Sequence, residues 1–154
     1  MKSLLLRVGI DKGCGGCLAP ILRDGSFEYI PIPEEQATTE DRLYKTLHGR
    51  HQQSLSPYLP RRLHSKVPHY DPEFETFTYG DPARNKSRQL SKLLPGDLLV
   101  FYTGLEPHDK EDLSRLFIIG YFTIARIHDF TRLPEFTWES LSRRLEKKEA
   151  EVSE

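Results

Sequence analysis

Hydrophobic positions along the chain fall mainly into short runs that predict β-strands. Such runs, rich in branched and aromatic residues and bounded by turn-forming residues, are typical of buried or half-buried strands. The segments with this pattern are residues 3–10, 19–23, 27–32, 98–103 and 116–127. Asp24-Gly25 supplies a turn between the second and the third, and Gly120 marks a bend within the last. We expect the last two segments to form the core hairpin of a sheet.

A helical period follows Asp81-Pro82, which is a typical N-cap and first-turn pair because the carboxylate accepts from amides that lack partners. Leu90, Leu93 and Leu94 then share one helical face, and Pro95-Gly96 ends the segment. Shorter or weaker helical patterns occupy residues 41–47 and 137–149. Strands interspersed with a few helices predict an α+β fold.

Two segments fit neither pattern well. Residues 49–67 contain Pro57 and Pro60 and predict a long irregular loop that carries basic side chains. Residues 74–79 alternate aromatic residues with polar ones and predict an extended chain. Phe74 and Phe77 are expected in the core, whereas Tyr79, beside a helix start, is the better candidate for a pocket wall.

Length and composition indicate one folded domain. The chain has 154 residues, 37% of them hydrophobic and 29% charged. We expect a single domain over residues 1–136 and a charged helix or tail over 137–154, whose abrupt end suggests either a truncated chain or a naturally short family member. The net charge of −1 argues against non-specific coating of nucleic acid, so that any nucleic-acid site must be local.

The first residues are too poor in apolar side chains for a secretory signal, and no segment is apolar enough to span a membrane. The chain has only two cysteines. These features predict a cytoplasmic protein that does not bind membranes.

Basic residues concentrate between residues 61 and 92. The candidates for contacts to nucleic-acid phosphates are Arg61, Arg62, Lys66, Arg84, Lys86, Arg88 and Lys92. Three of them, Arg84, Arg88 and Lys92, recur at every fourth residue and would form a row on one helix face. Such a row is either a solvated surface or a set of phosphate contacts, and both interpretations stay open.

A glycine-rich loop follows the first predicted strand. Gly13, Gly15 and Gly16 leave backbone amides accessible, which suits an anion such as a phosphate, and Asp11 at the strand end is a candidate acid or ligand. The spacing matches neither the G-x-G-x-x-G nor the Walker A motif, so a plain turn is the alternative.

Cysteine and histidine pairs supply a weaker metal-site hypothesis. Cys14 and Cys17 form C-x-x-C, and His48 and His51 form H-x-x-H, which are ligand types that suit zinc. The gap between the pairs is longer than in small zinc fingers, so no metal site is favoured. A redox C-x-x-C is disfavoured because two glycines separate the cysteines and such motifs begin a helix.

Longer motifs carry a family resemblance. The segment H-Y-D-P-E-F-E-T-F-T-Y-G-D at 69–81, with the opening R-V-G-I-D-K-G and the segment P-I-P-E, resembles the nucleotide-modification-associated domain family, type 3, from Leu4 to about Phe130. The helix that leads into G-D-L-L-V-F-Y is similar to the entry of the central strand in PUA-like domains (the PUA, ASCH, EVE and YTH relatives). The resemblance implies a PUA-like mixed β-sheet or partly open β-barrel with peripheral helices, and an association with base modification.

These observations leave two main functional hypotheses. In the first, the domain binds DNA, RNA or a nucleotide, and a modified base lies in a pocket of Tyr79, Tyr102 and Asp81 while the basic helix face contacts phosphates. In the second, the protein is an enzyme that acts on nucleotides or bases. Its candidate acid, base or metal-ligating groups are Asp11, His69, Asp71 and Asp81. No cofactor is implied, although a metal ion is compatible with these groups. A protein-interaction scaffold is the third and weakest alternative.

Overall fold

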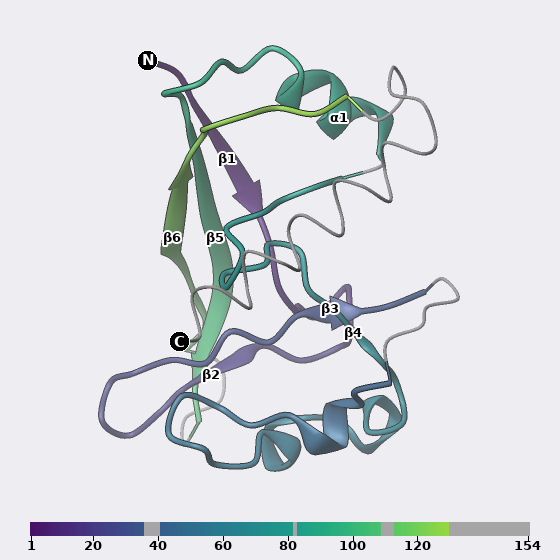
Figure 1. Cartoon of the computed structure of the whole chain (residues 1–154). Coiled ribbons are helices and arrows are strands. Elements are labelled where there is room, and N and C mark those ends of the chain that lie inside the picture. The colour runs from purple at the N-terminus through teal and green to yellow at the C-terminus, as the bar shows by residue number, and fades with distance from the viewer. Residues whose placement is uncertain (36–40, 82, 109–112, 130–154) are drawn as a thin grey trace, which may run out of the picture. The chain divides into compact units, whose positions relative to one another are not determined.

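The computed structural model describes residues 1–35, 41–81, 83–108 and 113–129 (Figure 1). Within these residues the protein is a mixed α/β structure made mostly of strands, with one α-helix. The main sheet has four strands. Its order is β1 (Ser3–Arg7), β5 (Leu98–Pro107) and β2 (Ala19–Ile21), and β6 (Arg115–Thr123) also pairs with β5. The described part of this sheet is open and does not close into the barrel that we considered.

The strands differ in extent from the predicted segments. β5 is longer than the apolar run at its start, because parallel pairing with β2 continues its far end: Ala19 lies opposite Leu105 and Ile21 opposite Pro107. The turn at Asp24-Gly25 is confirmed, with Gly25 at φ +83°, but beyond it only Phe27 forms a bridge, to Ile21. A second, antiparallel sheet pairs β3 (Ile32–Pro33) with β4 (Pro68–His69).

The chain forms two compact units that are interleaved in sequence. The larger unit comprises Leu5–Asp71 and Leu99–Tyr121, and the smaller unit comprises Met1–Leu4, Pro72–Leu98 and the residues from Phe122 on. We describe each unit separately. The predicted helix at 137–149 and the tail at 137–154 lie outside the described residues.

The larger unit has a core around the fully buried Tyr44, whose hydroxyl donates to the Pro31 carbonyl at 2.7 Å. Tyr44 belongs to a 3₁₀ turn, Tyr44–Thr46, where the sequence predicts a short helix. The irregular loop after it contains two more such turns, Ser56–Tyr58 and Arg61–Leu63. The loop is anchored rather than loose, because its leucines belong to the core. These buried leucines are Leu55, Leu59 and Leu63.

The smaller unit contains the α-helix, α1 (Arg84–Leu90), which begins later than predicted. Ala83 precedes it with extended dihedral angles and no side-chain cap. Asp81 is therefore not the N-cap, and its Oδ1 accepts a hydrogen bond from the Ala83 amide at 2.8 Å instead. The helix also ends before the last predicted leucines: Leu93 is buried beyond it, whereas Leu94 is exposed.

The aromatic segment before the helix is a tight turn and not an extended chain. Paired backbone hydrogen bonds of 3.0 and 3.2 Å join Glu73 and Thr78, and Phe77 has a left-handed φ of 55°. Phe77 is consequently exposed and not in the core, although its ring contacts Phe122 edge-on at 5.7 Å between centroids. Local turn geometry overrides the burial that the residue type favours.

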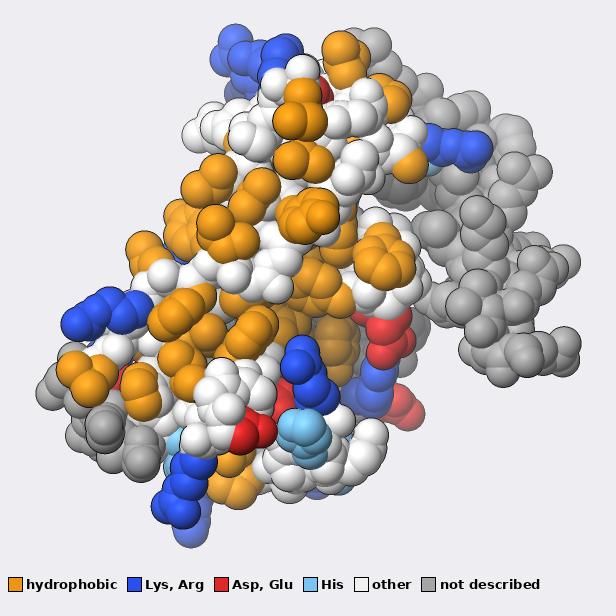
Figure 2. All heavy atoms as spheres, turned by 90° about the vertical axis from the view of Figure 1, so that its left-hand side faces the viewer, with side chains coloured by type: hydrophobic (Ala, Val, Ile, Leu, Met, Phe, Trp, Pro, Cys, Tyr) orange, Lys and Arg blue, Asp and Glu red, His pale blue; other side chains and the backbone are white. Residues whose placement is uncertain are grey.

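The predicted core hairpin is only half right. β5 contributes buried residues such as Phe101 and Leu105, but most of β6 is exposed to solvent. Figure 2, which faces the β6 side of Figure 1, shows hydrophobic side chains gathered over this face. Among the helices of the described residues, none is long and apolar enough to cross a membrane.

Candidate functional site

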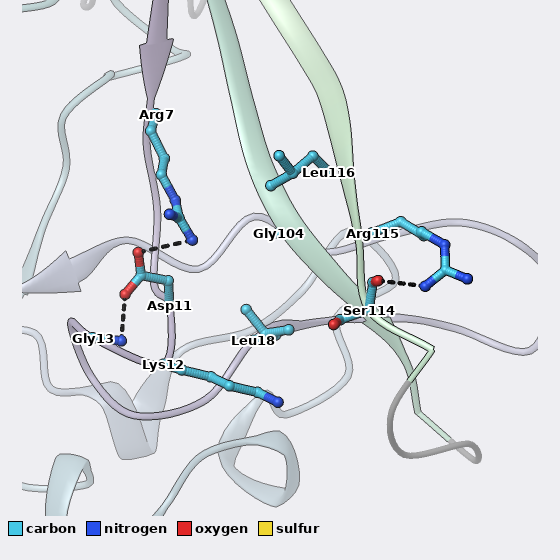
Figure 3. A pocket seen from close by; sticks show the side chains of 9 residues that line it. All are labelled: Arg7, Asp11, Lys12, Gly13, Leu18, Gly104, Ser114, Arg115 and Leu116. Carbon is cyan, nitrogen blue, oxygen red and sulfur yellow. Dashed lines mark hydrogen bonds and ion pairs between the residues drawn. The ribbon is translucent and has the colours of Figure 1, made fainter.

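A cavity of about 500 Å³ in the larger unit is the best candidate for a functional site (Figure 3). It lies where the end of β1, the glycine-rich loop, the middle of β5 and the start of β6 meet. The lining residues are Arg7, Asp11, Lys12, Gly13, Leu18, Gly104, Ser114, Arg115 and Leu116. The lining thus contains three cationic side chains and one carboxylate, of which Arg7 points toward Asp11 in Figure 3, and two leucines supply apolar wall.

Asp11 holds the glycine-rich loop together from within. Its Oδ1 accepts hydrogen bonds from the amides of Gly13 at 2.7 Å and Cys14 at 2.6 Å. Its backbone carbonyl accepts from the Gly16 amide at 2.8 Å. The amides of Gly13, Cys14 and Gly16, which could have bound an anion, therefore already donate to Asp11. An anion in the cavity would depend on the cationic side chains and not on these amides.

The charge of the cavity is positive because its carboxylate is already paired. Asp11 Oδ2 lies 3.2 Å from Arg7 Nη2. Lys12 is exposed and forms no ion pair with any residue that the structure describes. Arg115 donates from Nη1 to the Ser114 carbonyl at 2.8 Å, which leaves its charge uncompensated. Lys12 and Arg115 are the side chains available to an anionic ligand.

Two glycines in and beside the cavity lie in close contact with other side chains, where a larger residue would not fit. A Cβ on Gly104 would lie 3.0 Å from Leu18 Cδ2, so a larger residue there would press on the cavity wall. A Cβ on Gly16 would lie 1.9 Å from Arg62 Nη2. Arg62 approaches that closely because its Nη2 donates to the Gly15 carbonyl at 2.8 Å. The structure thus brings Arg62 and the glycine-rich loop together, while Arg61 and Lys66 are exposed.

A second cluster in the larger unit joins two predicted catalytic residues to one that the sequence did not single out. His69 Nδ1 lies 2.6 Å from Glu34 Oε2, and His69 Nε2 lies 3.9 Å from Asp71 Oδ2. The pairing of β3 with β4 positions the cluster, since Ile32 lies opposite His69 and Glu34 follows β3. His69 is partly exposed, whereas both carboxylates are mostly buried. A histidine held between two carboxylates is suited to proton transfer.

Two of the three residues predicted for the base pocket, Tyr79 and Asp81, interact directly. In the smaller unit the Tyr79 hydroxyl donates to Asp81 Oδ2 at 3.2 Å, and Lys86 Nζ lies 2.8 Å from the same oxygen. Tyr102 belongs to β5 in the larger unit. The remaining predicted phosphate contacts of the smaller unit, Arg84 and Arg88 on α1 and Lys92 just after it, are exposed.

The pKa of each cysteine thiol is raised, which lowers its reactivity. Burial and the charges of Asp11 and Glu35 raise the pKa of Cys14, and burial raises that of Cys17, against an opposing effect of Arg62. Both are free thiols. His51 Nε2 lies 3.8 Å from Asp24 Oδ2, and His48 is exposed. Within the described ranges, no three or more His, Cys, Asp and Glu side chains are arranged to hold a metal ion.

Several residues of these sites were missed by the sequence analysis. Arg7 and Lys12 flank Asp11 in the R-V-G-I-D-K-G motif, and Glu34 ends the P-I-P-E motif, so the motifs could have indicated them. Ser114 and Arg115 carry no such signal, because only the pairing of β6 with β5 brings them to the cavity.

Comparison with known proteins gives one match. Residues 2–153 match the model of a family described as nucleotide modification associated domain 3. No curated protein and no solved structure matches the chain.

Proposed function

Since the chain belongs to the nucleotide modification associated domain 3 family, we propose that its larger unit binds the phosphate of a nucleotide or nucleic acid in the cavity of Figure 3. The bound molecule would be a substrate or product of nucleotide modification. Lys12 and Arg115 would contact the phosphate, and Leu18 and Leu116 would contact the sugar or base.

The observation that carries this proposal is the unbalanced positive charge of the cavity. Arg7 is neutralised by Asp11, whose other oxygen is occupied by the loop amides, so that Lys12 and Arg115 remain for an anion. A guanidinium binds two phosphate oxygens at once, and an ammonium acts as a point charge. The volume of about 500 Å³ lies within the range of about 300–1,000 Å³ that is usual for small-molecule sites.

The finer features of recognition belong to the same proposal. Tyr79 would stack on a base whose edge forms hydrogen bonds with neighbouring groups. The exposed Arg84, Arg88 and Lys92 would contact phosphates of a longer nucleic-acid strand. Asp81 would orient Tyr79 through the hydrogen bond that it accepts from the Tyr79 hydroxyl. A PUA-like topology remains a prediction of the sequence resemblance.

Binding measurements test the cavity directly. Fluorescence anisotropy of labelled mononucleotides and short oligonucleotides is measured with wild type, Lys12→Ala and Arg115→Ala. We expect each variant to bind about tenfold more weakly, because a charge-assisted hydrogen bond contributes roughly 1.5 kcal/mol or more. Each should also reduce the salt slope for an oligonucleotide by about 0.7–0.9. Lys45→Ala, an exposed lysine outside the cavity, is the matched control. If Lys12→Ala and Arg115→Ala both bind with wild-type affinity, the phosphate site lies elsewhere.

A second candidate function is catalysis on a nucleotide, which the Glu34–His69–Asp71 cluster favours. Glu34 accepts a hydrogen bond from the Nδ1–H group and thereby fixes the ring, so Nε2 can take a proton from a substrate or from water and pass it on. Asp71, close to Nε2, would stabilise the charged ring.

A product scan tests this second function. Nucleosides and nucleotides, with and without divalent metal ions, are incubated with the protein and the products are separated by chromatography. We expect turnover by wild type that His69→Gln abolishes and Glu34→Gln lowers. His48→Gln, which changes an exposed histidine outside the cluster, should leave it unchanged. Equal turnover by wild type and His69→Gln would remove the cluster from the reaction.

A further inference from the structure

The exposed strand β6 has the properties of an unfilled pairing edge. Among the residues that the structure describes, β6 pairs with β5 alone, so its other edge presents backbone donors and acceptors without a strand partner. Over its residues Arg115–Thr123, β6 has no proline, no lysine and no acid, which are residues with which proteins protect such edges, and its one charge stands at its first position.

Apolar side chains are exposed on both faces of β6. Side chains alternate along a strand, so Leu116 and Ile118 share one face while Phe117 and Tyr121 share the other. Their exposed fractions are 65% and 69% on the first face, and 39% and 66% on the second. Figure 2 shows hydrophobic side chains spread over this side of the protein. Exposed apolar groups of this extent usually mark an interaction surface.

Exposure on both faces restricts the kind of partner. A helix or a domain packed on one face of the sheet would leave the other face in water. A strand added to the edge extends both faces at once and also satisfies the backbone groups. The added strand must be apolar on both of its faces, about nine residues long, and free of charges that would oppose Arg115.

β6 itself meets these requirements, and we propose that β6 pairs antiparallel with β6 of a second copy of this chain. A two-fold axis at the strand midpoint, Ile119, is the arrangement that overlaps the full strand. Phe117 of each copy then lies opposite Tyr121 of the other, and Ile118 lies opposite Gly120, where there is room for it. Arg115 lies opposite Thr123, so like charges do not meet.

The pairing has a consequence for the proposed phosphate site. Arg115 and Leu116 at the start of β6 line the cavity. Each copy would contribute one cavity, and the two cavities would lie at opposite ends of the shared strand pair. The eight steps from residue 115 to residue 123 correspond to roughly 27 Å at about 3.4 Å per residue, and this distance separates the two Arg115 backbones. The pairing does not depend on the cavity's ligand, so either proposal can fail alone.

Sedimentation measurements on the full chain over a wide range of concentration test the pairing. We expect the mass to rise from one chain to two, and Ile118→Lys to keep the protein monomeric because the added charge lies at the pairing edge. Leu5→Lys is the matched control: Leu5 is 59% exposed but belongs to β1, and its variant should dimerise like wild type. Circular dichroism of both variants establishes that they fold. A wild type that stays monomeric, or a dimer that survives Ile118→Lys, overturns the proposal.

A cross-linking experiment tests the register. In a chain with Cys14→Ser and Cys17→Ser, Ile119→Cys places one thiol at the two-fold axis, where cysteines on adjacent strands are close enough to bond. We expect a covalent dimer under mild oxidation, and none from Leu5→Cys in the same background. A dimer in solution without a disulfide through position 119 also overturns the proposed pairing.

Discussion

Glu34 Oε2 and His69 Nδ1 lie 2.6 Å apart, although 35 positions separate the two residues in the sequence. The contact depends on the short β3–β4 pair, in which Glu34 follows one strand and His69 ends the other. The Glu34 amide also donates to the Val67 carbonyl at 2.9 Å, which extends the pairing by one residue. This contact fixes the orientation of the imidazole and leaves Nε2 toward Asp71.

This contact predicts the tautomer of His69. When the ring is neutral, the proton should reside on Nδ1, because Glu34 Oε2 accepts it there. Nitrogen-15 NMR of the histidine side chains measures the tautomer directly. We expect Glu34→Gln to shift the population toward the Nε2–H form. The signals of His48, an exposed ring outside the cluster, should not change, and an unchanged His69 tautomer in Glu34→Gln would contradict the assignment.

Gly16→Ala should destabilise the protein more than Gly25→Ala. Both glycines have positive φ, +73° and +83°, and an alanine in that region costs roughly 1–2 kcal/mol. At Gly25 nothing lies within 4 Å of the added Cβ, whereas at Gly16 it would meet Arg62 Nη2. Arg62 must then leave the Gly15 carbonyl, which adds about 1 kcal/mol at this exposed site.

Urea unfolding of both glycine variants measures the difference. Adding Arg62→Ala to each variant separates the two contributions. In the Arg62→Ala background, Gly16→Ala should lower the free energy of unfolding only by the backbone contribution. The effect of Gly25→Ala on the free energy of unfolding should be the same in both backgrounds. Equal costs for Gly16→Ala with and without Arg62 would mean that the close contact does not carry the effect.

Alkylation should distinguish the two cysteines. The pKa of each thiol is raised, so the thiolate fraction near pH 8 is smaller than for a free cysteine and iodoacetamide should react slowly. Arg62 opposes the rise at Cys17, and Arg62→Ala should therefore raise the pKa of Cys17 further and slow its alkylation. The rate at Cys14, where Arg62 is not among the causes, should not change. Peptide mass spectrometry gives both rates; faster reaction of Cys17 in Arg62→Ala would contradict the sign.

Asp97 should contribute stability that is lost in acid. The backbone amides of Lys2 and Leu94 donate to its carboxylate at 2.6 and 2.9 Å and lower its pKa. A lowered folded-state pKa means that the contribution is complete above the unfolded-state pKa, near 3.9, and falls as the pH drops through the folded value. Asp97→Asn should therefore lower Tm at neutral pH and flatten its dependence on pH below about 4.

Thermal unfolding as a function of pH checks this prediction. Glu75→Gln, which changes an exposed carboxylate in the same unit, is the control and should leave Tm and its pH profile close to wild type. If Asp97→Asn changes Tm equally at all pH values, the charge of the carboxylate is not what these amides stabilise.

Much of the sheet was predictable because strand signals are local. The apolar run that begins β5, the first strand and the Asp24-Gly25 turn follow from residue types and their spacing alone. The start of α1 was not, since Asp81 and Pro82 fit an N-cap pair that the chain does not use there. Asp81 instead binds the Ala83 amide, Tyr79 and Lys86, which are competing partners that a cap motif does not reveal.

The sequence by itself determined the family, the strand-rich α/β character and the chemical types of the candidate groups, because each of these depends on contiguous residues. Tertiary structure alone decided which of those groups meet. It paired Asp11 with Arg7 and with its own loop amides, and it brought Glu34 to His69. It also placed Arg115 at the cavity and left the apolar β6 exposed. Strand pairing joins distant positions, and side-chain pattern specifies which face is apolar but not which strand or chain covers it.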